Sequence, residues 1–565
     1  MSLNGALNIG SSALAASQAA LQVTGNNIAN VGNANYSREV SVISDTPDQE
    51  ISSGVYIGTG ADLSAIQRQA DESLNGRLNS AMSDNQSATT TQNWSSQIET
   101  VFNALGSQSL DSQLSTFTSD WSNLANDPTN VAQRQVVIQD GQSLAQQFNG
   151  LSSQLQTIQS NLGSQLTSLT TSANQLAQQI ATLNQQIATS QGGGDSNNQL
   201  LDQRDAAVQQ LSQLVNVQTV NQGNGTVNVY IGSEPLVMGT SADSLTVQQS
   251  QVNGQPTYSL LFASNNGPVT ATSGQIGATV GAQSQINTVR QQLDSLAGGL
   301  IFGVNSIYSS GQGLTGYSSV TGTNQVLNQT AALNSTAAGL AFQPVNGSFV
   351  VTTTNSQTGL SSSTLVPVNL TGQPSDTTLT SLTASLNAIP NISASVQGGM
   401  LNIASTDPNV TITFSQDSSH VLAALGINSF FQGSNAGSMA VNSTVAANPN
   451  LLAAAQNGDP GDNQNALAIA NFPSTTQSIL GNQSWTEAYG SMINGIATTT
   501  ATATSNVSST QDIVQALQTQ QQNVSGVSLD QETVNMLQQQ RSYQGAAMYI
   551  SAVNQMMQSL LNITL

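Results

Sequence analysis

The sequence predicts an α+β multidomain protein, in which both chain ends form long coiled-coil-like helices and β-rich outer domains are inserted between them. Three observations support this fold class: both ends carry apolar residues spaced seven apart, residues 144–187 extend such a pattern over many turns, and much of the middle alternates as strands do. With 565 residues the chain is also too long for one hydrophobic core, so several domains are expected.

The two ends share the same helical period. The N-terminal seam consists of Leu7, Leu14, Leu21 and Ile28, and the C-terminal seam of Leu529, Met536, Tyr543, Ile550 and Met557. Residues seven apart fall on one face of a helix, so each seam needs a partner. That partner is the other terminus or the termini of neighbouring subunits. Packing of both seams on one globular core is the alternative.

The N-terminal seam is too small to be stable by itself. Burial of four large side chains contributes about 6–12 kcal/mol. Ordering about 25 residues costs roughly 1–2 kcal/mol each before hydrogen bonds are counted. We therefore expect frayed or disordered ends in a free subunit and ordered ends in an assembly.

A long helix is expected around residues 144–187. Apolar residues recur there in alternating steps of four and three, with one stutter at Ile158, Leu162 and Leu166. A helix of about 45 residues would be roughly 65 Å long. Gly192–Gly194 should end it. A phosphate loop is not indicated, because no strand precedes these glycines and no lysine follows them.

The remaining elements divide into helices and strands. Helices are predicted at 62–105, 283–305, 379–388 and 485–522, and strands at 215–220, 227–231, 257–262, 269–272 and 410–414. Gly223-Asn224-Gly225 marks a hairpin between the first two strands. The predicted domains are 1–60 with 525–565 (terminal coiled coil), 61–205 with 455–524 (helical bundle), 206–317 (β-rich with a helical return) and 318–454 (outer β-rich).

The composition excludes several classes of function. Only 6% of residues are charged, and seven arginines without any lysine stand against 28 acidic residues, for a net charge of −21. Such a chain lacks the basic surface that binds nucleic acid or an anionic membrane. It has no cysteine, no basic and apolar leader at its start, and no run of 18 apolar residues, so neither a cleavable signal peptide nor membrane insertion is expected.

No catalytic constellation is visible, and the chain is not expected to be an enzyme or to hold a metal or cofactor. The single histidine, His420, follows Asp417-Ser418-Ser419, but a triad requires convergence in space rather than a run within one loop. A turn or surface histidine is the better interpretation. With no lysine, Schiff-base chemistry is excluded.

Motifs near both ends resemble one protein family. The N-terminal region reads AALQVTGNNIANV at residues 19–31 and then Tyr36-Ser37-Arg38, and the C-terminal region reads SGVSLDQE at 525–532 and QRSYQ at 540–544. These segments resemble the bacterial flagellar rod, hook and hook-associated axial proteins. The Tyr-Ser-Arg ending, the chain length and LLDQRD at 200–205 point to the hook–filament junction member. One departure is Asn33-Ala34-Asn35, where the family usually has Thr-x-Gly; Asn tolerates the left-handed conformation that the turn needs.

The resemblance implies a structural role in the flagellum, at the junction between hook and filament. The implied partners are the hook protein, a second junction protein (hook-associated protein 3), further copies of the chain in a ring or helical layer, and a cytoplasmic export chaperone at the C-terminal segment. Export without a cleavable signal and an extracellular location are implied as well. The rivals are a hook-type axial subunit, which would polymerise alone into long tubes, and a surface adhesin or fibre protein.

Five polar side chains near the seams are candidate contacts between subunits. These are Asn26, Asn27, Asn30, Arg38 and Arg541. Helix capping by the asparagines and ion pairs within the chain are the alternatives.

Two further arginines could anchor carboxylates. Arg134 could do so within a domain or between subunits, and for Arg204 a local bridge to the neighbouring Asp202 or Asp205 is favoured.

Overall fold

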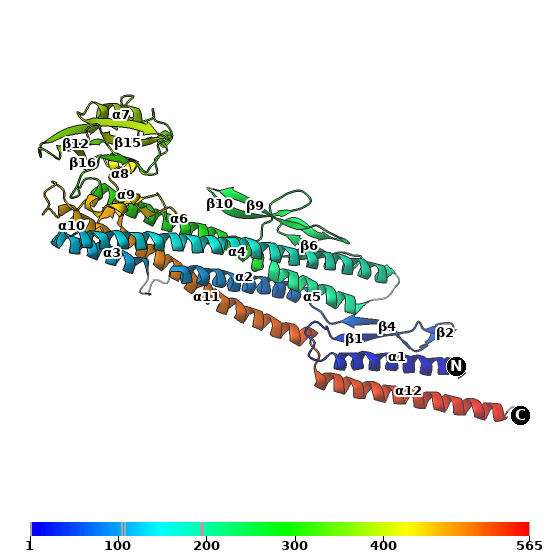
Figure 1. Ribbon diagram of the computed structural model, residues 1–565. Coiled ribbons are helices and arrows are strands. Elements are labelled where there is room, and N and C mark those ends of the chain that lie inside the picture. The colour runs from blue at the N-terminus through cyan, green and yellow to red at the C-terminus, as the bar shows by residue number, and fades with distance from the viewer. Residues whose placement is uncertain (1–2, 103–105, 107–108, 193–196, 253, 564–565) are drawn as a thin grey trace. The chain divides into compact units, whose positions relative to one another are not determined.

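The structure, a computed structural model, describes residues 3–102, 106, 109–192, 197–252 and 254–563. Two compact units are present. The first unit comprises Met1–Trp94, Asn161–Gln283 and Thr502–Leu565, and the second comprises Ser95–Ser160 and Ser284–Ala501. Both units are therefore built from segments far apart in the sequence, as Figure 1 shows by colour. The four-domain division expected from the sequence stays a prediction.

Long helices dominate both units, and four of them have residues in each. The helices are α1 (Leu3–Ala29), α2 (Glu72–Phe102), α3 (Leu110–Asn126), α4 (Val131–Gly192), α5 (Asn198–Leu214), α6 (Gly274–Tyr308), α7 (Leu379–Asn387), α8 (Val421–Leu425), α9 (Ser443–Ala447), α10 (Gln464–Ala470), α11 (Trp485–Ser525) and α12 (Leu529–Ile563). The fold class predicted from the sequence, an α+β protein with long terminal helices and strands in the middle, is confirmed.

The predicted heptad pattern accounts for the burial of α4. Of its expected core positions, Leu169 and Leu176 are half-buried and the others from Leu144 to Ile187 are buried. The stutter therefore shifts the buried face slightly, toward Ala173 and Ala177. The helix reaches Gly192; Gly193 and Gly194, expected to end it, lie outside the described residues.

The first unit combines helices with small antiparallel sheets. These are β1 (Glu39–Asp45) with β4 (Ala61–Arg68), the hairpin β2 (Gln49–Ser52) with β3 (Val55–Ile57), β9 (Leu245–Val252) with β10 (Gln255–Phe262), and the four strands β5 (Gln218–Asn221), β6 (Val227–Ile231), β7 (Glu234–Met238) and β8 (Ser241–Ala242). One core joins the sheet residues Val229 and Leu236 to Ala177 of α4 and Leu211 of α5. A smaller cluster packs Leu78 of α2 near Leu517 of α11, so these two predicted helices lie side by side.

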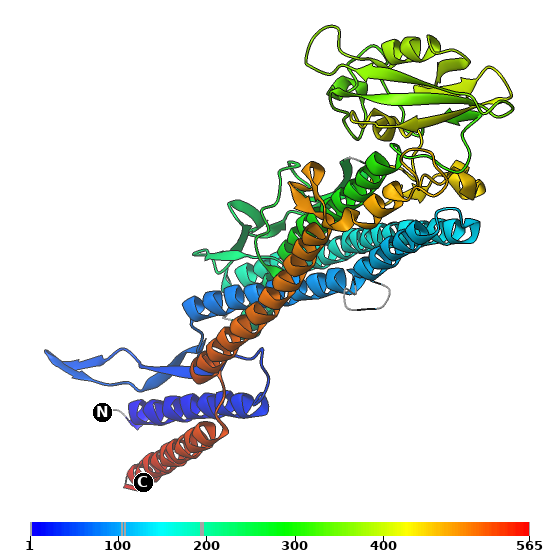
Figure 2. The ribbon, with the colours of Figure 1, turned by 90° about the vertical axis from the view of Figure 1, so that its left-hand side faces the viewer.

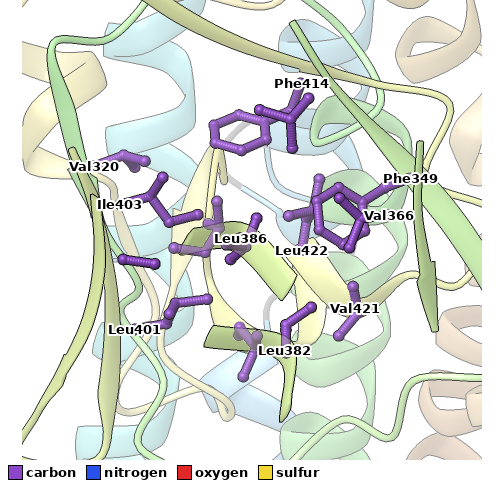
Figure 3. Close-up of a cluster of buried hydrophobic side chains, with 14 of the residues drawn as sticks. Val320, Phe349, Val366, Leu382, Leu386, Leu401, Ile403, Phe414, Val421 and Leu422 are labelled. Atoms are coloured by element: carbon purple, nitrogen blue, oxygen red, sulfur yellow. The ribbon is translucent and has the colours of Figure 1, made fainter. Parts of the chain in front are cut away.

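The outer part of the second unit is a β-rich domain. Its sheets are β13 (Ser361–Val368), β12 (Gly347–Asn355) and β16 (Val410–Ser415), and β11 (Ser319–Thr321), β15 (Met400–Ser405) and β14 (Ile392–Gln397). Alternate residues of these strands point inward with α7 and α8, and Figure 3 shows Phe349, Leu386, Ile403 and Phe414 in this core. Buried positions alternate with half-buried ones along β12 and β16; the buried ones include Phe349, Val351, Ile412 and Phe414, and the half-buried ones are mostly Ser and Thr, as in strands with one covered face.

The second unit also contains short strands and 3-10 turns. The strands are β17 (Phe431–Gln432), β18 (Ala440–Val441), β19 (Thr476–Gln477) and β20 (Gln483–Ser484), and the turns are Thr336–Ala338, Pro449–Leu451, Phe472–Ser474 and Ser478–Leu480.

Three predicted element boundaries and one predicted strand were wrong. The helix expected from residue 62 begins only at Glu72, because 61–68 pairs with β1 as a strand. The strand expected at 269–272 is absent; Pro268 makes a single bridge to Leu261, and α6 starts at Gly274 rather than near 283. Val215 ends α5 instead of starting a strand.

None of the helices in the described part of the chain is long and apolar enough to cross a membrane.

A carboxyl pair in the second unit yields a prediction. Burial and the neighbouring Asp120 of α3 raise the pKa of Asp140, on α4, from 3.8 to about 7. The folded state thus keeps a proton that the unfolded chain loses above about pH 4, so folding stability falls as pH rises from 4 to 7. Asp140→Asn should raise the melting temperature at about pH 8 and change it little at about pH 4, measured by scanning calorimetry.

The matched control is Asp459→Asn, at an exposed aspartate of the same unit. It should leave the melting temperature unchanged at both pH values. An equal effect of Asp140→Asn at both pH values would contradict the assignment.

Candidate assembly site at the joined chain ends

The terminal helices α1 and α12 lie side by side in both views of the first unit (Figures 1 and 2). The face of α1 that is buried carries small side chains, among them Ala6, Gly10, Ser17, Ala20, Thr24 and Asn27. Their spacing of three and four residues forms a heptad stripe one position before the predicted N-terminal seam. We call this set the small stripe of α1.

Gly10 marks a close approach between the two helices. A Cβ atom placed on Gly10 would lie 2.7 Å from Cγ1 of Ile550 and 3.0 Å from Cδ1 of Tyr549. The missing side chain therefore lets the helices approach closely. Sequence reasoning noticed small residues between the seam leucines, but did not identify them as the packing face.

The predicted seams flank this contact. Leu7, Leu14, Leu21 and Ile28 are half-buried beside the small stripe. On α12, Met536, Ile550 and Met557 are half-buried, whereas Leu529 and Tyr543 remain exposed. The structure thus brings parts of both seams together within one chain, and their role between subunits stays a prediction.

A partly buried polar cluster ties the two chain ends together where α1 ends and α12 begins. The terminal polar cluster consists of Asn27, Tyr36, Arg38, Glu39 and Glu532. Glu532 is buried, and its carboxylate accepts hydrogen bonds from Arg38 Nε at 2.8 Å and Asn27 Nδ2 at 3.1 Å. The amide oxygen of Asn27 accepts from Tyr36 Oη at 2.7 Å and from the Glu39 backbone N–H at 3.0 Å. Every polar atom of the Asn27 side chain is thereby used within the chain.

The Tyr-Ser-Arg motif connects this cluster to the rest of the first unit. The backbone N–H of Ser37 donates to Asp202 Oδ2 at 3.0 Å, and that of Arg38 donates to the Ser525 carbonyl at 2.9 Å. Three segments therefore meet here: the turn after α1, the start of α5 and the end of α11. The N-terminal motif, the LLDQRD segment and the residues before α12 are therefore in contact in the folded chain.

Arg68 of β4 completes the joint, and sequence reasoning missed it. Its Nη1 lies 3.0 Å from Asp202 Oδ1 and 2.7 Å from Asp205 Oδ2, so one guanidinium forms ion pairs with both carboxylates. Arg204 contacts Asp205 only at 3.5 Å and donates mainly to the Gly225 carbonyl at 2.7 Å. The predicted local bridge of Arg204 thus exists but is the weaker contact. Nothing in the sequence marked Arg68, because its partners lie far along the chain.

Burial and nearby carboxylates keep the Tyr36 hydroxyl of the cluster protonated. Burial, reinforced by Glu39, Asp202 and Glu532, raises the pKa of Tyr36 far above its ordinary value, so its hydroxyl stays a donor to Asn27. Burial lowers the pKa of Arg204, which Asp205 opposes. Three of the seven arginines of the chain, Arg38, Arg68 and Arg204, lie at this joint.

The other candidate polar contacts are placed differently. Asn26 lies exposed, 3.5 Å from the Glu39 carboxylate, and Asn30 donates back to the Asn26 carbonyl at 3.0 Å, as a helix-end residue does. Arg541 is exposed on α12. Contacts between subunits through these residues remain a prediction, while Asn27 and Arg38 are engaged within their own chain. Arg134, for which a carboxylate was considered, is buried and donates instead to the Pro128 and Leu452 carbonyls.

The joint borders a cavity of about 680 Å³ with a mainly polar lining that includes Tyr36, Arg68 and Asp205. Across the described residues, no three His, Cys, Asp or Glu side chains gather as metal ligands would. His420 precedes α8 in a left-handed turn, while Asp417 accepts hydrogen bonds from Ser419 and from the Leu422 backbone. This is the geometry of a helix start, so the Asp-Ser-Ser-His run serves a turn.

Removal of the Arg68 guanidinium tests the joint. Arg68→Gln leaves Asp202 and Asp205 without their shared cation and should lower the free energy of unfolding by about 2–3 kcal/mol. Urea unfolding followed by far-UV circular dichroism measures this change.

Arg77→Gln is the matched control, because Arg77 is exposed on α2. Its effect should stay within about 0.5 kcal/mol. Equal stabilities of the two variants would show that the Arg68 pairs contribute nothing.

Two known protein families match separate regions of this chain. Residues 95–324 match the family described as the flagellar hook-associated protein FlgK helical domain. Residues 523–563 match the C-terminal family of the flagellar basal body rod proteins FlgEFG. The second match covers α12, which the terminal polar cluster holds against α1.

Full-length relatives agree with these matches. The chain is 25% identical to flagellar hook-associated protein 1 of Escherichia coli K12 and to that of Salmonella typhimurium LT2, and each alignment covers 99% of both chains. A solved structure, the flagellar hook junction protein FlgK from Burkholderia pseudomallei, is similar with a TM-score of 0.49 at 19% identity, covering 80% of this chain and 100% of that one. The two family matches and the full-length relatives confirm the resemblance to the flagellar axial proteins that the terminal motifs predicted, and this resemblance centres on flagellar hook-associated protein 1.

Proposed function

We propose that this protein is a structural axial component of the bacterial flagellum that forms the junction between hook and filament. Similarity to flagellar hook-associated protein 1 over 99% of both chains is the observation that carries this proposal. The joined chain ends are consistent with it, because the matched rod-protein segment is the helix that pairs with α1. The role is structural rather than enzymatic.

Assembly would proceed by folding of the terminal helices against subunits already in place. In the single chain, α12 leaves large apolar side chains exposed, among them Val534, Leu537, Met548 and Met556. Such exposure is unfavourable in water and is relieved by contact with another subunit. Addition would then be confined to the growing tip, where partners for these helices exist.

The proposed partners follow from the junction role. They are the hook protein on one side, the second junction protein (hook-associated protein 3) on the other, and further copies of the chain in a ring or helical layer. A cytoplasmic export chaperone would cover the apolar C-terminal segment before export, which would proceed without a cleavable signal. The flagellum would place the assembled protein outside the cell.

A hook-type axial subunit is the alternative, with a surface adhesin as a more distant one. The match of residues 95–324 to the hook-associated helical domain favours the junction role over both.

Replacement of Ile550 tests the assembly role. Ile550 lies where α12 approaches Gly10, so Ile550→Asp would place a charge against the small stripe of α1. We expect a soluble chain with a folded second unit, but incorporation into flagella about ten-fold lower or absent. Quantitative immunoblotting of purified flagella, with circular dichroism of the free subunit, measures both quantities.

The control is Gln540→Asp, which adds the same charge at an exposed position of α12. It should incorporate normally. Normal incorporation of Ile550→Asp would remove the paired terminal helices from the assembly mechanism.

A further inference from the structure

The hairpin β2–β3 is an exposed apolar arm of the first unit. Its side chains Ile51, Val55 and Tyr56 are 55%, 50% and 61% exposed. Within the described residues these two strands pair with each other and with no third strand, and an isolated two-stranded hairpin is marginally stable in water. An arm of this kind gains stability when a second surface covers its apolar residues.

The same arm is acidic. Residues 45–59 contain Asp45, Asp48 and Glu50 and no basic residue, and all three carboxylates are exposed. A surface that covers the arm should therefore combine apolar side chains with positive charge.

The first unit carries one such surface, on α12. Val534, Leu537, Arg541 and Met548 follow one another along one face; the apolar three are 63%, 52% and 68% exposed, and Arg541 is exposed too. With 3.6 residues per turn, this face lies opposite Met536, Ile550 and Val553, which face the covered side of α12. We call these four residues the outer stripe of α12. Arg541 is the sole charged residue between 533 and 563, and charges are rare in this chain.

We infer that the β2–β3 hairpin of one copy docks on the outer stripe of α12 of the next copy, with Arg541 facing the hairpin carboxylates. Within a chain α1 lies between the β1–β4 side and α12 in both views, so the contact must form between copies (Figures 1 and 2). This inference rests on the proposed function, since it names a contact inside the proposed layer.

The kind of contact agrees with a layer of subunits. Hairpin and outer stripe are different patches of one chain, so their pairing is heterologous. Heterologous contacts repeat from copy to copy and generate rings or helical arrays, whereas a self-complementary contact stops at a dimer. A ring or helical layer follows from this single pairing.

The absence of cysteine makes the contact directly testable. A chain carrying Val55→Cys and Met548→Cys should, in isolated flagella, form a ladder of dimers, trimers and larger species on brief oxidation. The second pair, Ile51→Cys with Gln544→Cys, uses an exposed position one helical turn from Met548, as the closeness of Ile51 and Val55 in the hairpin requires, and tests the same contact independently. The control pair, Val55→Cys with Gln540→Cys, places the thiol about 100° around the helix from Arg541 and should cross-link weakly.

Charge reversal supplies a second readout. Arg541→Glu added to the first cysteine pair should lower the cross-linked fraction several-fold, and Asp48→Arg added to that variant should restore it. Cross-linking no stronger than in the control pair, for both test pairs, would overturn the inference, as would species that stop at dimers. Wild-type incorporation into the same flagella is scored in parallel. Its absence would refute the proposed function itself, whereas normal incorporation without a ladder would refute only this contact.

Discussion

The joined chain ends depend on one buried carboxylate. Glu532 accepts hydrogen bonds from Arg38 and Asn27, which lie 494 and 505 positions before it in the sequence. A buried charge is tolerated only when it is paired and hydrogen-bonded, so Glu532 requires the turn after α1 in its observed place. The same turn places the backbone N–H of Ser37 against the carboxylate of Asp202, which Arg68 also binds. The polar joint therefore links α12, α1, β4 and α5. Charged side chains have few possible partners in this chain, because only 6% of its residues are charged.

The apolar contact between α1 and α12 complements this joint. Along α1 the buried residues are small, and Gly10 lets Ile550 and Tyr549 come close. Such a face buries little apolar area for its length, so the pairing gains only part of its stability within one chain. Both this limited burial and the exposed outer stripe of α12 are consistent with helices that complete their packing against other subunits.

Periodicity predicted the long elements well. The seven-residue spacing identified both terminal helices, and the steps of four and three predicted the buried positions of α4 from Leu144 to Ile187. The strand at 61–68 was missed because its state depends on pairing with β1, which local pattern does not encode. At the site, the terminal motifs led to Asn27 and Arg38 as candidate contacts. Arg68 and Glu532 were not predicted as site residues, because ion pairs between distant segments leave no local signal in the sequence. The seam leucines were named correctly as helical neighbours, whereas the small residues beside them form the closer contact.

Assembly-coupled folding, as proposed, means that the terminal helices fold fully only in the flagellum. Limited proteolysis of the purified subunit, with mass spectrometry of the surviving core, measures this. We expect rapid loss of roughly the first 50 and last 40 residues, while the remaining core resists and the same ends become protected in isolated flagella. Ends as resistant as the core in the free subunit would mean that the terminal polar cluster suffices to fold them, and assembly-coupled folding would be wrong.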